Sequence, residues 1–138
     1  MDGFGARHSM GSATWNGKTV MFFGQDVIQG KCFNHLYNFD NEKCELEKLE
    51  YLKADQLKPK KRNSQSSVQV GSKAYIYGGA NDEGPLNDAL ELDLETMKFK
   101  YLKIANPTEA PYFEMHTAHV YQGKKMLLIG GRSHVLPT

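Results

Sequence analysis

Two histidines three residues apart, His116 and His119, form the arrangement in this chain that most resembles a metal site. Imidazole rings bind zinc or copper when both can reach the same ion. The residues around them have strand character, and side chains three apart on a strand point to opposite faces. The pair therefore predicts no shared metal ion. The remaining histidines are scattered without ligand spacing: His8, His35 and His134.

Hydrolytic chemistry would require a nucleophile, a base and an orienting acid within reach of one another. The candidate nucleophiles lie in stretches of small residues, where strand packing accounts for them: Ser9, Ser12, Ser66 and Ser67. No acid pair repeats along the chain, and no glycine-rich loop leads from a strand into a helix, as phosphate binding requires. We predict no catalytic, cofactor-binding or metal-ligating residue and therefore no enzyme.

The two cysteines, Cys32 and Cys44, invite a disulfide interpretation. A predicted strand separates them, so roughly eleven extended residues lie between their Cα atoms, far beyond the ~7 Å limit for a bridge. We expect two free thiols in a reducing compartment. No stretch approaches the roughly 18 apolar residues of a membrane span, and the first residues contain no apolar signal core. These features predict a cytoplasmic protein without a membrane partner.

The basic run Lys58–Arg62 could bind an acidic partner, but it also fits a solvated loop, which we favour. The formal net charge of the chain is only +1. Nucleic-acid binding favours a basic excess over the domain with interleaved aromatic residues, and neither is present. The composition therefore excludes nucleic acid as the expected partner.

The elements that position all these residues are organised around Ala74–Gly79, an apolar run that ends in two glycines. Similar runs occur at Val20–Gly24, 54 residues earlier (78 − 24), and at Met126–Gly131, 52 residues later (130 − 78). Each run follows a glycine-containing turn. Short apolar runs bounded by turns indicate buried strands. The glycines allow the backbone to leave the sheet at positive φ, which we expect for Gly78 or Gly79.

A second set of landmarks repeats with the first. Phe33–Asp40 matches Leu86–Asp93, and a large apolar residue follows each aspartate after six positions, Leu46 and then Phe99. A period near 50 residues is typical of a repeat architecture in which each unit is one small sheet.

The repeated unit resembles the kelch repeat, in which an arginine and a small-residue strand precede a turn, a buried strand and a double glycine. A tyrosine and a tryptophan follow later in that repeat. The resemblance covers essentially the whole chain and implies a structural role for His116. This sequence departs from the pattern at three kinds of position: Gly24-Gln25 replaces the first double glycine, Leu46 and Phe99 replace the tryptophan, and the arginine position holds Arg7, Lys61 and Phe113.

The resemblance implies an all-β fold of kelch-type β-propeller blades, each with four antiparallel strands. The predicted units are blade 1 at about 6–53, blade 2 at about 59–105 and half of a third blade at about 109–138. This gives ten strands. A propeller closes with about four to eight blades, so we expect an incomplete ring that needs further blades from a longer polypeptide, or a covering partner. We prefer the longer polypeptide.

The predicted function is a protein-interaction scaffold. In a propeller, the loops before the first strand and after the second strand of each blade open on one face, and loops on a rigid scaffold commonly carry function. These loops offer six candidate partner-binding residues: Arg62, Asp82, Glu83, Tyr112, Phe113 and Arg132. The alternatives are an oxidase-like enzyme with an active site in absent blades and a structural subunit of a large assembly.

Overall fold

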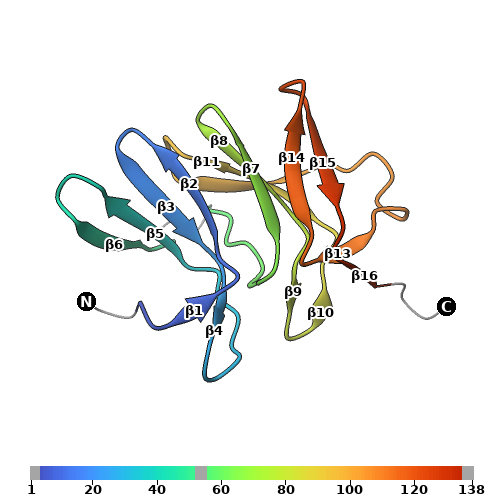
Figure 1. Cartoon of the computed structure of the whole chain (residues 1–138), viewed down its shortest axis with the longest axis horizontal. Coiled ribbons are helices and arrows are strands. Elements are labelled where there is room, and N and C mark those ends of the chain that lie inside the picture. The colour runs from blue at the N-terminus through green and yellow to red at the C-terminus, as the bar shows by residue number, and fades with distance from the viewer. Residues whose placement is uncertain (1–3, 52–55, 135–138) are drawn as a thin grey trace.

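The computed structural model describes residues 4–51 and 56–134, and within these ranges all regular structure is β-strand (Figure 1). Two sheets have four antiparallel strands and a third has two. Blade 1 has the order β2 (Gly11–Trp15), β3 (Lys18–Phe22), β5 (Leu36–Asp40) and β6 (Glu45–Leu49). Blade 2 has the order β7 (Ser66–Val70), β8 (Lys73–Tyr77), β11 (Ala89–Asp93) and β12 (Lys98–Leu102). The half-blade consists of β14 (Thr117–Tyr121) and β15 (Lys125–Ile129).

Six shorter strands pair into three ribbons beside these sheets. The ribbons are β1 (Arg7–His8) with β4 (Gln25–Asp26), β9 (Ala80–Asn81) with β10 (Gly84–Pro85), and β13 (Tyr112–Glu114) with β16 (Arg132–His134). The all-β class and the ten blade strands are as predicted. The ribbons were not predicted, because strands of two or three residues are too short to show a hydrophobic period.

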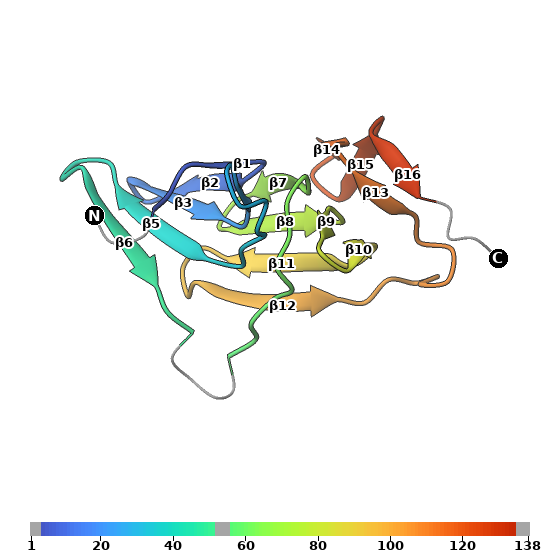
Figure 2. The same ribbon diagram turned by 90° about the horizontal axis from the view of Figure 1, so that it is seen from below.

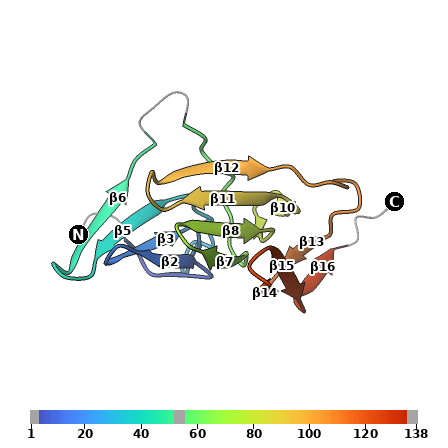
Figure 3. The same ribbon diagram turned by 90° about the horizontal axis from the view of Figure 1, so that it is seen from above.

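The sheets are arranged side by side in a fan (Figure 2). Seen from above, the first strands β2, β7 and β14 lie along one side, and the fourth strands β6 and β12 lie along the other (Figure 3). The main core lies between blades 1 and 2, where the apolar second and third strands of both sheets meet. It contains Val20, Phe22, Phe23, Leu36, Ala74, Ile76, Leu90, Leu92, Leu94 and Phe99.

In both full blades, a two-residue hairpin turn precedes the second strand. The strand pairing shows that the turn glycines of the two blades, Gly17 and Gly71, are not equivalent. Asn16 and Gly17 both take positive φ, 48° and 71°, as a two-residue hairpin turn of the right twist requires. In blade 2 the turn is Gly71-Ser72, so Gly71 is equivalent to Asn16 and not to Gly17. The equivalence follows from Trp15 pairing with Lys18 and Val70 with Lys73.

The double glycine behaves as predicted in blade 2, where Gly78 and Gly79 have φ of 63° and 89°. In blade 1, however, the equivalent pair is Phe23-Gly24, with φ of 66° and 98°, and the assignment to Gly24-Gln25 is wrong. The sequence alignment was displaced by one residue because Phe23 stands where blade 2 has its first glycine. Gln25 does not have positive φ and continues into β4.

Phe23 is therefore an aromatic residue in a conformation that favours glycine, which is costly for a bulky side chain. Its ring is 1% exposed and packs against Phe22 and Phe99, with ring centroids 5.6 and 5.5 Å away. Burying a phenylalanine side chain contributes about 1.5–3 kcal/mol. That gain is large enough to offset the backbone cost of about 1–2 kcal/mol.

Both cysteines are free, as predicted. Cys32 is buried at the junction between the blades, where the Asn63 side-chain amide donates a hydrogen bond to its Sγ at 3.0 Å. Burial raises the pKa of the Cys32 thiol. Cys44 is exposed in the turn after β5. Across the residues that the structure describes, no helix is long and apolar enough to cross a membrane.

Candidate protein-binding surface

The three ribbons lie at the same end of the sheets (Figure 1), and we call this end the ribbon face. The same pairing builds each ribbon position: His8 with Gln25, Asn63 with Ala80, and Glu114 with Arg132. Each pair joins the residue three positions before an inner strand to the residue directly after the positive-φ pair. In every unit, the segment that leads into the inner strand and the loop that leaves the second strand therefore meet at the ribbon face.

The loop after β4 ends in an apolar tip formed by Val27 and Ile28, which are 58% and 90% exposed. Asp26 holds this tip in one shape, because its Oδ1 accepts hydrogen bonds from the backbone N–H groups of Ile28 and Gln29 at 2.8 and 2.5 Å. These backbone donors lower the pKa of Asp26. The Asp26 carbonyl also accepts a bond from Gly30 at 3.1 Å. An ordered loop therefore presents two apolar side chains to solvent.

The β9–β10 ribbon ends in an acidic tip, formed by the exposed residues Asp82 and Glu83. The Glu83 backbone N–H donates a hydrogen bond to Asn81 Oδ1 at 2.9 Å, which fixes the turn. Both carboxylates therefore stand on a short, closed hairpin.

Beside this hairpin lies a polar hollow of about 200 Å³. Its lining includes Lys60, Glu83, Asp88 and Tyr112. Tyr112 lies in β13, against which β10 packs. The hollow therefore brings two of the six predicted residues, Glu83 and Tyr112, to one place on the ribbon face.

Phe113 and Arg132 lie near each other in the third ribbon, in which Phe113 pairs with Ser133 and Glu114 with Arg132. Phe113 is only half-exposed, because its ring packs against His116 at 5.7 Å. Arg132 is 64% exposed at its side chain and forms an ion pair of 3.5 Å with the buried Glu114. Arg132 therefore remains available at the surface, whereas Phe113 is largely part of the packing between blades.

Arg62 is the exception among the predicted surface residues, because it is 0% exposed. Its guanidinium donates two hydrogen bonds to the Asp88 carboxylate, at 2.6 and 2.9 Å, and one to the Gly78 carbonyl at 3.0 Å. It also lies 5.2 Å from the Phe23 ring. Arg62 therefore joins the two blades from inside and does not contact a partner at the surface.

The hydrogen bonds of the double turns identify the true arginine position of the repeat. Gly24 N–H donates to the Arg62 carbonyl at 3.0 Å, and Gly79 N–H donates to the Phe113 carbonyl at 2.8 Å. Arg62 is thus equivalent to Phe113, and the assignment of Lys61 to this position is wrong by one residue. Lys61 is exposed in the loop.

His116 and His119 do not share a site. His116 lies just before β14, is 6% exposed, and its Nε2 is 2.6 Å from Ser66 Oγ, so it joins the half-blade to blade 2. Burial lowers the pKa of His116. His119 lies within β14 and is exposed. Within 4–51 and 56–134, no group of three or more His, Cys, Asp or Glu side chains is placed to hold a metal ion.

Sequence reasoning did not name Val27 and Ile28, although it included their loop among the loops of the candidate face. The available signal was the run Asp26-Val27-Ile28-Gln29-Gly30, in which two apolar residues stand between turn-forming residues. Apolar residues inside a turn cannot reach a core on either side. They therefore indicate an exposed apolar tip.

Comparison with known proteins agrees with this architecture. The family described as the KLHDC2/KLHL20/DRC7 Kelch-repeats domain matches residues 3–136. No curated protein matches the chain. The family match spans both blades, the half-blade and all three ribbons, and the chain belongs to the kelch-repeat family.

Proposed function

We propose that this chain binds a protein partner through the ribbon face, with the apolar tip Val27-Ile28 as the central contact. Kelch-repeat domains generally mediate protein–protein interaction. The ribbon face has the elements that such a contact requires: short loops held by hydrogen bonds, exposed apolar side chains and exposed charges of both signs.

The observation that carries the proposal is the 90% exposure of Ile28 on a loop that Asp26 holds in place. An isoleucine exposed to water forgoes about 1.5–3 kcal/mol of burial free energy. A partner that covers it recovers this energy. Because the loop is already ordered, little conformational entropy is lost on binding.

The charges around the tip define the kind of partner surface that fits. Asp82 and Glu83 give the neighbouring ribbon an acidic end, and Arg132 adds a positive charge on the third ribbon. A complementary partner has an apolar pocket for Ile28, with basic groups facing the β9–β10 ribbon and an acidic group facing Arg132. Charge pairs at the rim mainly set specificity and association rate.

The proposal is tested in two steps. A photo-crosslinking amino acid is placed at Gln29, beside the tip, and in a second version at Lys98 on the outer strand β12, and the crosslinked proteins are identified by mass spectrometry. The partner specific to the Gln29 version is then purified and its affinity measured by calorimetry. Ile28→Asp is expected to weaken binding at least tenfold.

Tyr121→Asp is the matched control, since Tyr121 is also an exposed large apolar residue but lies at the end of β14, at the opposite end of the sheets from the ribbons (Figure 1). It is expected to leave the affinity unchanged. Equal affinity of Ile28→Asp and the unaltered chain would contradict the proposal, as would an equal loss in both variants.

A further inference from the structure

Tyr101 is one of two tyrosines with an exposed side chain, although the chain has seven tyrosines. It is 42% exposed on β12, and Tyr121 is 47% exposed at the end of β14. The other five are buried or half-buried, and three of them use their hydroxyl groups inside the fold: Tyr37, Tyr51 and Tyr77. Tyr101 is therefore open to a modifying enzyme in a way that the packed tyrosines are not.

The fold does not require an aromatic residue at the position of Tyr101. Its equivalent in blade 1 is Lys48, since each lies three positions after the residue that pairs with the last aspartate of the third strand, Asp40 or Asp93. A lysine thus occupies the same place in the other full sheet. Sheet packing alone does not explain why blade 2 has a tyrosine there.

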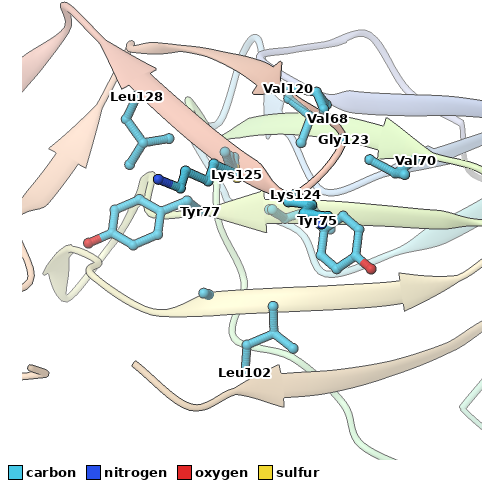
Figure 4. Close-up of a pocket in the computed structure, with 13 residues that line it drawn as sticks. Val68, Val70, Tyr75, Tyr77, Leu102, Val120, Gly123, Lys124, Lys125 and Leu128 are labelled. Atoms are coloured by element: carbon cyan, nitrogen blue, oxygen red, sulfur yellow. The ribbon is translucent and has the colours of Figure 1, made fainter. Parts of the chain in front are cut away.

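The side chain of Tyr101 faces the junction between the two blades. In Figure 4 its neighbour Leu102 points from β12 into a groove of about 480 Å³ between blade 2 and the half-blade. Successive side chains on a strand point to opposite faces, so Tyr101 points the other way, toward the loop that connects the blades. The Lys60 backbone N–H donates a hydrogen bond to the Tyr101 hydroxyl at 3.4 Å, which establishes this contact.

The strand that carries Tyr101 is the outermost one of its sheet. Among the described residues, β12 pairs with β11 alone. An edge strand has free backbone N–H and C=O groups with which a bound protein can pair. An enzyme can therefore hold the segment around Tyr101 as an extended chain without unfolding the sheet.

The loop beside the Tyr101 hydroxyl is held in place by its buried residues. Pro59 is buried, and its carbonyl accepts a hydrogen bond from the Asn34 side-chain amide at 3.0 Å. The Arg62 backbone N–H donates to the Phe33 carbonyl at 3.2 Å, and the Arg62 side chain is fully buried. The exposed residues of this loop are therefore presented on a fixed backbone.

This loop, which we call the basic loop, carries three exposed lysines: Lys58, Lys60 and Lys61. None of them forms an ion pair within the part of the chain that the structure describes, whereas Lys48, Lys73 and Lys100 each do. Lys60 and Glu83 line the same polar hollow without forming such a pair. The positive charge next to the Tyr101 hydroxyl is thus uncompensated among these residues.

We propose that Tyr101 is a phosphorylation site for a protein tyrosine kinase and that the lysines of the basic loop hold its phosphate. In the reaction, Tyr101 Oη attacks the γ-phosphorus of ATP. The bond from that phosphorus to the β–γ bridging oxygen breaks, and ADP leaves. The phenolic proton passes to a carboxylate of the kinase.

The surroundings of the Tyr101 hydroxyl suit a phosphate. Phosphotyrosine carries about −1.5 to −2 charges at pH 7 and three strong acceptor oxygens. The Lys60 N–H is already directed at the Tyr101 oxygen, and lysine ammonium groups form charge-assisted hydrogen bonds with phosphate. Tyr101 is also flanked in sequence by Lys98, Lys100 and Lys103, so the fitting kinase has an acidic substrate groove.

The phosphate acts on the ribbon face through the basic loop. In Figure 2 the connection that ends at β7 crosses this end of the sheets from the fourth strands to the first strands. Lys60 lines the hollow beside the β9–β10 hairpin. A phosphate on Tyr101 that attracts the Lys60 ammonium group makes the hollow more negative. The modification itself does not depend on the partner contact at Ile28.

The first test asks whether Tyr101 is the modified residue. The whole chain is incubated with ATP, Mg²⁺ and a panel of purified tyrosine kinases that includes kinases with acidic substrate grooves, and mass spectrometry locates the phosphate. Tyr101 is expected to be phosphorylated at least tenfold faster than Tyr121. Tyr121 is the matched control, because it is at least as exposed and lies close to Lys124 and Lys125, but its strand β14 lies between β7 and β15 (Figure 1).

The second test asks whether the basic loop holds the phosphate. Phosphotyrosine replaces Tyr101 during translation, and its release by a purified tyrosine phosphatase is measured. Combining Lys58→Gln, Lys60→Gln and Lys61→Gln is expected to accelerate the release at least fivefold, because the phosphate loses its contacts.

The matched control for the second test combines Lys18→Gln, Lys43→Gln and Lys124→Gln. These lysines are equally exposed, but they lie in or beside the hairpin turns at the opposite end of the sheets from the ribbons. The control is expected to change the release less than twofold. All six lysines are exposed, so both variants should fold, as circular dichroism can verify.

Four results would overturn the proposal. These are absence of phosphate on Tyr101 with every kinase of the panel, phosphorylation of Tyr121 as fast as that of Tyr101, phosphatase release that the basic-loop substitutions leave unchanged, and equal acceleration by the two sets of lysine substitutions.

Discussion

Removing the negative charge beside Arg62 should destabilise the protein far more than removing an exposed charge. The side chain of Arg62 is 0% exposed and that of Asp88 is 23% exposed. Asp88→Asn keeps the size of the side chain but leaves the buried guanidinium without its counter-charge. Hydrogen bonds to charged groups contribute about 1.5–3 kcal/mol each, and breaking a buried pair costs about 3–5 kcal/mol.

Two adjustments lower this range. Asparagine retains one oxygen that can still accept a bond from Arg62, and water reaches the partly exposed position of Asp88. We therefore expect Asp88→Asn to reduce the free energy of unfolding by about 2–4 kcal/mol. Because small domains have about 5–15 kcal/mol in total, this is a large fraction of the stability.

The control is Glu50→Gln, which removes a carboxylate that forms a 3.2 Å ion pair with Lys48. These side chains are 58% and 36% exposed, so the loss should be at most about 0.5 kcal/mol. Both variants are measured by urea unfolding with the fluorescence of Trp15, the one tryptophan of the chain.

A double-mutant cycle separates the ion pair from the other bonds of the arginine. Arg62→Met and Asp88→Asn, alone and combined, should show a coupling energy above about 1 kcal/mol. The reasoning is refuted if Asp88→Asn falls within 1 kcal/mol of the unaltered protein, or if it matches Glu50→Gln.

Three further predictions concern the backbone, the pH dependence and the thiols. Gly79→Ala should lower the free energy of unfolding by about 2–4 kcal/mol, since φ is 89° and the new Cβ would lie 2.4 Å from the Asn63 carbonyl oxygen. The control Gly71→Ala, at φ 57° with open space around the new Cβ, should lower it by only about 1 kcal/mol. Both are measured by urea unfolding, and equal losses would contradict this prediction. Desolvation, then Lys48 and Arg7, lower the pKa of His35 from 6.5 to about 4. As the pH falls, His35 is therefore protonated in the unfolded chain before it is protonated in the folded chain. The contribution of His35 to the free energy of unfolding is fully present above pH 6.5 and is lost between pH 6.5 and about 4. In urea unfolding at several pH values, His35→Gln should remove about 1–2 kcal/mol of this acid-induced loss in the free energy of unfolding, after allowance for solvent screening. An unchanged pH dependence would count against it. Cys44 should react with a thiol reagent rapidly and Cys32 only on unfolding, because Cys32 is buried and its pKa is raised; equal rates would show that the junction between the blades opens freely.

The sequence predicts the blade strands well, because apolar runs such as Ala74–Tyr77 and the glycines after them are local signals. The sequence prediction placed the first double turn one residue too late, at Gly24-Gln25, for a physical reason. Phe23 takes the place of a glycine there, and its backbone cost is offset only by packing against residues distant in sequence. A local pattern cannot show such compensation.

The candidate surface was predicted less completely. Of the six residues predicted to contact a partner, Asp82, Glu83 and Arg132 are exposed at the ribbon face. Arg62 was misplaced because charged residues are usually at the surface, and its burial depends on Asp88, which lies on another segment.

The hydrogen bonds from each double turn to the following repeat have a consequence for synthesis of the chain. Gly24 donates to Arg62, 38 residues later (62 − 24), and Gly79 donates to Phe113, 34 residues later (113 − 79). At about 5–20 residues per second, each turn on a growing chain waits roughly two to eight seconds for its acceptor. Every repeat therefore leaves the ribosome before it can finish folding, and it becomes complete only when its successor emerges.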